Sequence, residues 1–128
     1  MSYYFSKVLP IGFDKAVQRT TEALQREGFG IITEIDVKQT LKAKIGVDFR
    51  NYRILGACNP KLAYEALQLE DKIGTMLPCN VIVRQDEAGT TMVEFMDPNA
   101  VLQLVDRPEV NAIAAEVRAR LVRVMESL

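Results

Sequence analysis

Two cysteine–asparagine pairs are the residues of this 128-residue chain whose types and placing could do chemistry. Cys58 and Asn59 follow the run "RILGA", where a strand-like pattern ends and a helical one begins, and Cys79 and Asn80 follow Pro78. A cysteine just before a helix N-terminus lies at the positive end of the helix dipole, which lowers its pKa and favours the nucleophilic thiolate. If the two strands are neighbours, the thiols approach each other. The pairs therefore indicate a redox-sensing pair, a thiol nucleophile or a soft-metal site.

A purely structural role is the competing interpretation of the same residues. Free cysteine is among the most buried residue types, and a separation of 21 positions matches neither a zinc pattern nor a CxxC pair. The chain contains no histidine, which removes the commonest metal ligand and general base. We therefore expect packing at both corners, with no metal and no cofactor. Cys58, Asn59, Cys79 and Asn80 are kept as the candidate ligand or thiol site.

The elements that would position these residues follow from hydrophobic periodicity and from turn residues. Alternation predicts strands over residues 2–9, 30–36, 51–58, 79–85 and 90–96. Helical spacing predicts long helices over residues 13–28 and 108–128, short inserted helices over 36–46 and 59–70, and a helical turn over 98–105. Without the insertions the order is strand, helix, four strands, helix. This order predicts an α+β domain with a mostly antiparallel sheet covered on one face by the first and last helices.

Capping residues mark the starts of both inserted helices. Asp36 is a suitable N-cap with Gln39 three residues later, and Gly46 ends that helix. Asn59 is the predicted N-cap of the second, followed by Pro60 at the first helical position, where no N–H is needed.

The second face of the sheet is more apolar than a solvated face should be. Alternation that puts Ile31, Ile35 and Ile54 under the helices leaves five large apolar residues on the other side, where they form a candidate dimer or binding face. Three explanations remain open: a second cover made by residues 36–46 or 59–70, a homodimer interface, or a ligand-binding trough. The five residues are Ile32, Leu55, Ile82, Met92 and Met96.

Length, composition and charge exclude several classes of protein. The 128 residues fit one domain, spanning 1–128, and 48% apolar content is ordinary for a globular protein. A net charge of −1 does not attract nucleic acid, and the basic stretch between Lys38 and Arg53 is too weak to change that expectation. Neither a signal peptide nor a membrane span is recognisable, so we expect a cytoplasmic protein with no membrane partner.

Three runs resemble the prokaryotic family catalogued as domain of unknown function 302. They are "TEIDVKQTLKAKIG" (33–46), "YRILGACNP" (52–60) and "LPCNV" (77–81), and the resemblance extends over about residues 3–127. It implies a domain of strand–helix–four-strand–helix type like the repeats of the TATA-binding protein, a similarity of architecture that says nothing about DNA binding. It also implies a small dimeric protein with no assigned activity and with no established site residues to carry over.

Two functional hypotheses follow. The first is a homodimeric, non-catalytic ligand-binding or accessory protein, whose ligand would be a small molecule. The alternative is a thiol-dependent redox sensor or small enzyme that uses Cys58, Cys79 or both.

Overall fold

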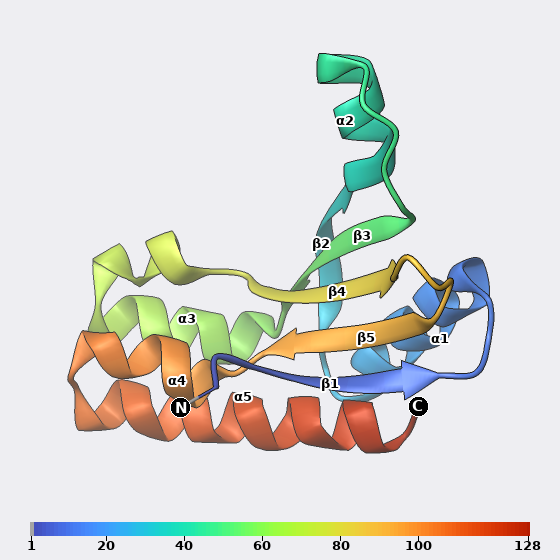
Figure 1. Ribbon diagram of the computed structural model, residues 1–128. Helices are drawn as coiled ribbons and strands as arrows, with labels where there is room; N and C mark the ends of the chain where they lie inside the picture. Colours follow the sequence, from blue (N-terminus) through green and yellow to red (C-terminus); the bar gives the residue numbers. More distant parts are fainter. Residues whose placement is uncertain (1) are drawn as a thin grey trace.

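The computed structural model describes residues 2–128 and confirms the predicted α+β order (Figure 1). The strands are β1 (Tyr4–Leu9), β2 (Gly30–Asp36), β3 (Tyr52–Cys58), β4 (Cys79–Gln85) and β5 (Thr91–Met96). The α-helices are α1 (Phe13–Arg26), α2 (Val37–Ile45), α3 (Pro60–Leu69), α4 (Pro98–Leu102) and α5 (Pro108–Glu126), with 3-10 turns η1 (Asp71–Met76) and η2 (Gln103–Val105). The inserted helices are α2 and α3, as predicted.

The five strands form one antiparallel sheet in the order β1-β5-β4-β3-β2. The tight turn between β4 and β5 is held by Asp86, whose Oδ1 accepts hydrogen bonds from the backbone N–H groups of Ala88 and Thr90. Gly89 completes this turn with φ +82°, a conformation that only glycine adopts without strain. The N-terminal strand β1 pairs with β5, so the β4–β5 hairpin lies in the middle of the sheet, between β1 and β3.

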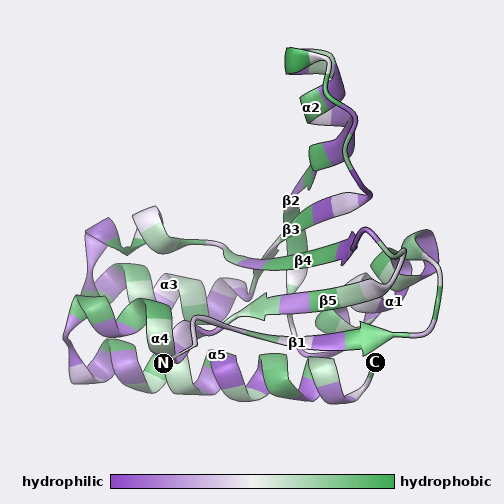
Figure 2. Cartoon of the chain, in the orientation of Figure 1, coloured by the Kyte–Doolittle hydropathy of each residue, from purple (hydrophilic) through white to green (hydrophobic). Residues whose placement is uncertain are grey.

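Helices α1 and α5 cover one face of the sheet, which we call the inner face (Figure 1). Val81, Val83, Val93 and Phe95 point to this face and are fully buried. The predicted apolar stripe of the last helix is confirmed, and Figure 2 shows apolar residues recurring along α5. Its buried members are Val110, Ala114, Val117, Leu121 and Val124.

The helix starts that capping residues predicted are present. Asp36 Oδ1 accepts from the backbone N–H of Gln39 at 3.0 Å, and Gly46 ends α2 with φ +68°. Asn59 Oδ1 accepts from the backbone N–H of Leu62 at 3.2 Å and opens α3, where Pro60 takes the first position. Helix α3 therefore begins at a fixed point directly after the end of β3.

Neither inserted helix covers the second face of the sheet, so the first of the three explanations is wrong. Helix α2 projects away from the body at the ends of β2 and β3 and has no buried residue (Figure 1). Helix α3 packs against α5 and η1 instead. No helix within residues 2–128 lies over the second face, which we call the outer face.

The prediction that Leu55 lies on the outer face is wrong. Leu55 pairs with Val81, is 1% exposed and belongs to the core under α1 and α5. Its neighbour Ile54 pairs with Ile82 and points to the outer face instead. After Arg53, residues 54–57 ("ILGA") carry no polar side chain, so they show no alternation from which the facing of each side chain could be read.

A register shift in β2 changes two further assignments. The pairing with β3 is irregular between Ile31 and Thr33, as in a β-bulge. The extra residue there is Ile32, which is 61% exposed and lines a cavity at the end of the sheet rather than the outer face. Beyond the shift the alternation reverses, so Ile35 pairs with Ile54 on the outer face and is not under the helices as predicted.

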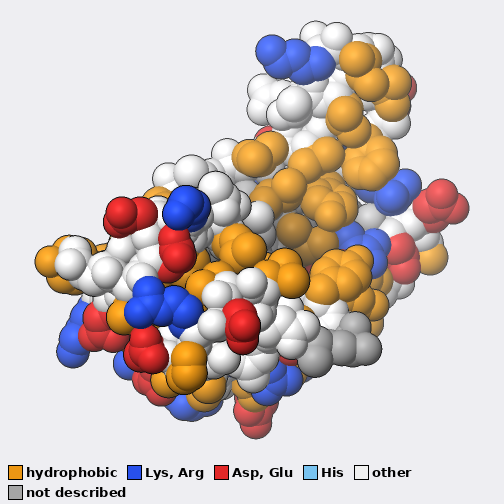
Figure 3. Space-filling model, turned by 90° about the vertical axis from the view of Figure 1, so that its left-hand side faces the viewer, with side chains coloured by type: hydrophobic (Ala, Val, Ile, Leu, Met, Phe, Trp, Pro, Cys, Tyr) orange, Lys and Arg blue, Asp and Glu red, His pale blue; other side chains and the backbone are white. Residues whose placement is uncertain are grey.

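The outer face is an open apolar surface around one ion pair. At its centre Arg84 Nε donates to Glu94 Oε1 at 2.5 Å, and this hydrogen bond raises the pKa of Arg84. Figure 3 shows hydrophobic side chains gathered below the projecting α2 and continuing onto it. The large residues that share this face are Tyr4, Val8, Ile35, Tyr52, Ile54, Ile82, Met92 and Met96.

Candidate functional site

The structure brings three of the four predicted site residues to one apolar cavity. Cys58 ends β3, Asn59 opens α3, and Cys79 begins β4 in the neighbouring position of the sheet. All three line a cavity of about 330 Å³ between the end of the sheet and the helices. A volume of this size falls within the range of small-molecule sites.

The walls of this cavity come from α3, η1, α4 and α5 and from the ends of β2, β3 and β4. Helix α3 contributes Ala63 and Ala66, and α5 contributes Ile113 and Val117 from a distant part of the chain. None of the lining residues is Lys, Arg, Asp or Glu. The large apolar contributors are Phe29, Ile32, Leu62, Leu67, Leu77, Leu102, Ile113 and Val117.

Asn80 lies apart from the other three candidates. It pairs with Gly56, is exposed and lines a second, more polar hollow on the outer face together with Tyr52, Arg84 and Glu94. The reason is the alternation of β4, because consecutive residues of a strand point to opposite faces. The two Cys-Asn pairs of the sequence are therefore not equivalent in the fold, because Asn59 lines the cavity and Asn80 does not.

The two thiols are free and neither is activated. Burial raises the pKa of Cys58, and it raises the pKa of Cys79 to about 11, with a further contribution from the nearby Cys58. Because their pKa values are raised, both thiols are protonated near neutral pH. The reactive form of cysteine is the thiolate, so neither thiol is a good nucleophile there. The raised pKa values favour the interpretation of both cysteines as apolar wall residues over that of activated thiols.

A close approach of three segments shapes the sheet beside the cavity. A Cβ atom on Gly56 would lie 2.0 Å from Thr33 Oγ1 and 2.8 Å from Pro78 Cγ. Only glycine fits there, since real Cβ atoms do not come so close to other atoms. Gly56 therefore lets β2 and the Leu77–Pro78 segment, whose peptide bond is cis, pack against β3.

The remaining wall residues were not recognisable in the sequence. Phe29, Leu102, Ile113 and Val117 are ordinary members of helical or strand patterns, and such patterns predict burial without saying which buried residues border a void. Tertiary packing brings these four residues together around the cavity. Among residues 2–128 no group of three or more His, Cys, Asp or Glu side chains is placed to hold a metal ion.

Comparison with known proteins identifies the family of this chain. A family model described as "Domain of unknown function DUF302" matches residues 5–128. The chain belongs to the DUF302 family. This confirms the resemblance seen in the three sequence runs.

A solved structure agrees with this assignment. The DUF302 chain resembles an uncharacterized conserved DUF302 protein from Bacillus stearothermophilus, with a TM-score of 0.91, 29% sequence identity and 98% of each chain covered. No curated protein matches the chain. Within the described residues, no helix is both long and apolar enough to cross a membrane.

Proposed function

We propose that this DUF302 protein is a cytoplasmic homodimer that binds a small, largely apolar molecule without transforming it. The observation that carries the proposal is the cavity of about 330 Å³ walled by apolar side chains from the sheet, α3 and α5. Engineered apolar cavities of about 150 Å³ stay dry and bind benzene, so a cavity about twice as large has room for a larger apolar molecule.

Binding without catalysis is supported by the chemistry of the walls. Cys58 and Cys79 are the only lining side chains that titrate, and burial keeps both protonated by raising their pKa. Asn59 uses its Oδ1 to cap α3. General acid–base catalysis needs a group with a pKa near the working pH, which these residues do not supply. Two free thiols also suit a reducing compartment.

A fluorescent titration tests this function. N-phenylnaphthylamine is uncharged, apolar and brighter in apolar surroundings, so its emission should rise and saturate with the native protein. Ala63→Phe, which fills the cavity from α3, should lower the affinity for the dye about tenfold or more while the far-UV circular dichroism stays unchanged. Ala115→Phe, an exposed position on α5 away from the cavity, is the matched control. Equal binding by both variants would exclude the cavity as the site.

The homodimer is supported by a helix that lacks a partner within the described chain. Helix α2 has nine residues, none of them buried, and helices this short are not stable in water without tertiary packing. Its apolar stripe of Val37, Leu41 and Ile45 has the chemistry of the open outer face. Figure 3 shows hydrophobic side chains continuing from below α2 onto the projecting segment. In a two-fold dimer the same patch serves both copies, so α2 of one copy would pack on the outer face of the other.

Charge favours a second copy as the occupant of the outer face. The exposed residues Lys38, Lys42 and Lys44 make α2 basic even though Lys42 pairs with Asp48 at 3.0 Å. The turn between β4 and β5 carries Asp86 and Glu87, of which Glu87 lies 3.9 Å from Arg50. In a two-fold pair the basic helix of each copy meets an acidic edge of the other, which favours association and fixes its orientation.

Light scattering tests the dimer. Ile82→Lys combined with Met92→Lys places two charges in the proposed interface and should convert a dimer mass into a monomer mass. Leu104→Lys is the control, because Leu104 is 75% exposed on η2 and lies outside the outer face. A wild-type monomer contradicts the homodimer, and an unchanged dimer in the double variant rules out the outer face as its interface.

A further inference from the structure

We propose that the free edge of β1 binds an extended segment of another protein, which adds a further strand to the five-stranded sheet. The partner pairs its backbone with Ser6 and Val8 and carries apolar side chains on the outer face. The inference concerns backbone groups at an edge of the sheet, so it does not depend on the cavity or on the proposed dimer. It rests on which groups of β1 point away from β5.

Hydrogen bonding along β1 alternates between its two sides. In an antiparallel pair, every second residue exchanges backbone hydrogen bonds with the partner strand, and the residues between them point the other way. The backbone N–H of Asp97 donates to the oxygen of Tyr3 at 2.8 Å, so the odd-numbered residues of β1 face β5. The backbone N–H and C=O groups of Tyr4, Ser6 and Val8 therefore point to the free edge.

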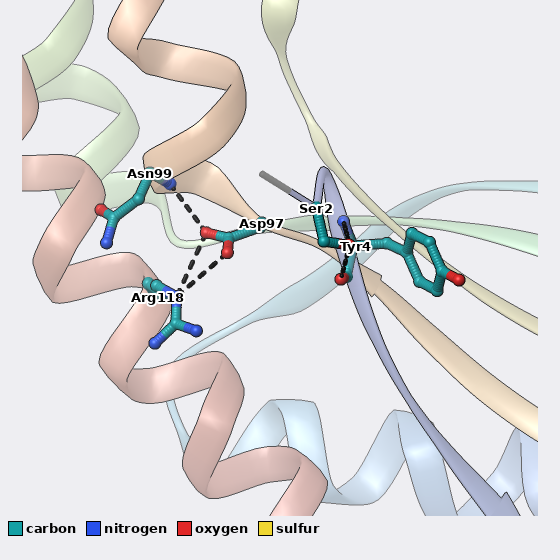
Figure 4. Close-up of polar contacts among 5 residues, drawn as sticks. All are labelled: Ser2, Tyr4, Asp97, Asn99 and Arg118. Carbon is teal, nitrogen blue, oxygen red and sulfur yellow. Dashed lines mark hydrogen bonds and ion pairs between the residues drawn. The ribbon is translucent and has the colours of Figure 1, made fainter.

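A side chain already occupies the first of these three positions. The Ser2 hydroxyl donates to the backbone oxygen of Tyr4 at 2.7 Å and accepts from its N–H at 3.4 Å (Figure 4). Ser2 thus bonds to Tyr4 in the way that a residue of a neighbouring strand would. Within residues 2–128, the edge-facing N–H and C=O groups of Ser6 and Val8 have no hydrogen-bond partner, so they are open to another strand.

The two edges of the sheet differ in how they resist pairing. Natural edge strands are commonly protected by bulges, charges or proline. The other edge strand, β2, has an irregular register and carries the carboxylates of Glu34 and Asp36. Strand β1 is regular over its six residues and contains no proline, and its one charged residue, Lys7, donates to the backbone oxygens of Met125 and Leu128. Strand β1 is therefore the less protected edge.

Charge and hydrogen bonding favour a different protein over a second copy at this edge. Two antiparallel β1 strands that used only the open groups would place Lys7 opposite the partner's Lys7, and like charges directly opposite each other are destabilising. A register centred on Ser6 would pair Val8 with Tyr4, whose backbone groups already have a partner. A register centred on Val8 would pair Ser6 with Pro10, which has no N–H.

The register also defines the chemistry of the partner. Residues directly opposite each other in a sheet share a face, so the partner's residues opposite Ser6 and Val8 lie on the outer face. Val8 is 60% exposed there and pairs with Met92 of β5, which favours apolar side chains in the partner. The residue between them lies opposite Lys7 and should be neutral or acidic. Backbone hydrogen bonds would then supply affinity, and these side chains would supply selectivity.

A fluorescently labelled peptide of sequence Val-Thr-Val-Thr-Val with blocked ends tests strand addition by anisotropy. It should bind the native protein saturably, with its valines on the outer face and their N–H groups towards β1. N-methylation of the valines should therefore weaken binding about tenfold or more. N-methylation of the threonines, whose N–H groups would point away from β1, is the matched control and should leave the affinity within about twofold.

Variants of Ser6 locate the binding edge. Ser6→Pro removes an N–H that faces the free edge and no hydrogen bond to β5, and edge strands tolerate proline at such positions. It should weaken the unmethylated peptide about tenfold or more, whereas Ser6→Ala keeps the N–H and should bind as the wild type does. Far-UV circular dichroism checks that both variants fold. The two methylated peptides decide the question on the wild-type protein if Ser6→Pro does not fold.

The outcomes separate this proposal from the proposed function. No saturable binding by the wild type, equal binding of the two methylated peptides, or equal binding by folded Ser6→Pro and Ser6→Ala overturns strand addition at β1. A light-scattering mass that is lower for Ser6→Pro than for the wild type would place a second copy at this edge and overturn the choice of partner. Loss of dye binding in the cavity bears on the proposed function alone.

Discussion

Arg118 shares its Nε hydrogen between both carboxylate oxygens of Asp97, at 3.2 Å from each, and so ties α5 to the end of β5 (Figure 4). The same carboxylate caps α4 by accepting from the backbone N–H of Asn99 at 3.0 Å, and the backbone N–H of Asp97 donates to the oxygen of Tyr3 at 2.8 Å. Asp97 therefore joins the N-terminal segment, β5, α4 and α5. Helix α4 carries Leu102, so this junction also fixes one wall of the cavity.

Replacing Asp97 should separate its two roles. Asp97→Asn keeps the cap of α4 and removes the charge that faces Arg118, whose side chain is 40% exposed, so it should cost no more than about 1 kcal/mol of unfolding free energy. Asp97→Ala also loses the cap and should cost about 1 kcal/mol more. Urea denaturation measures both, and equal losses in the two variants would show that the cap contributes nothing.

Removing the Thr20 hydroxyl should stabilise the protein. Thr20 is 0% exposed, and its Oγ1 has no hydrogen-bond partner among residues 2–128. An unpaired buried hydroxyl is costly, so Thr20→Val should raise the free energy of unfolding by about 1 kcal/mol. Thr21→Val is the control in the same helix, because Thr21 Oγ1 donates to the oxygen of Val17 at 2.9 Å. Two variants with the same change in stability would mean that Thr20 Oγ1 is not unsatisfied.

Adding a methyl group to Gly56 should destabilise the protein. Thr33 could rotate away from the new Cβ, but the Pro78 ring at 2.8 Å cannot, so Gly56→Ala should cost about 1–3 kcal/mol. Gly30→Ala, in the adjacent strand, meets no atom within 4 Å and should be nearly neutral. Thermal unfolding compares the two variants, and a neutral Gly56→Ala would refute the close approach.

The buried thiol of Cys79 should make stability fall at alkaline pH. Its pKa rises from 9.0 to about 11 on folding, so between these values the native state holds a proton that the unfolded state releases. Stability is therefore intact below pH 9 and declines as the pH rises towards 11, by about 2–3 kcal/mol. Cys79→Ala should flatten this decline in urea titrations from pH 8 to pH 11. The same slope in wild type and variant would mean that Cys79 is accessible to water.

Local interactions were the part of the fold that the sequence could predict. Asp36, Gly46, Asn59 and Pro60 act within a few residues of their own positions, so their types alone indicate where helices begin and end. The stripe along α5 is likewise a property of one helix, and it predicts burial in any fold that covers that face. The α+β order follows from the sum of such local signals.

Pairing between strands was the part that the sequence left open. Leu55 and Ile54 are both large and apolar, and their facing is decided by the register of β3 with β4, in which Leu55 meets Val81. The irregularity at Ile32 reverses the alternation of β2, and neither Ile32 nor its neighbours Ile31 and Thr33 is a glycine or proline that would mark it. A shift of one residue reverses every side chain of a strand, so local patterns do not fix which face it buries.

The elements of this DUF302 protein, their order and the placing of two cysteines at strand ends could be predicted from local sequence patterns. Packing between distant segments puts Cys58, Asn59 and Cys79 around one cavity and leaves Asn80 on the outer face. It also decided that Arg120 meets Asn59 beside Gly28. Helix and strand formation depend on neighbours in sequence, whereas a cavity depends on packing between segments as distant as Phe29, Cys79 and Val117.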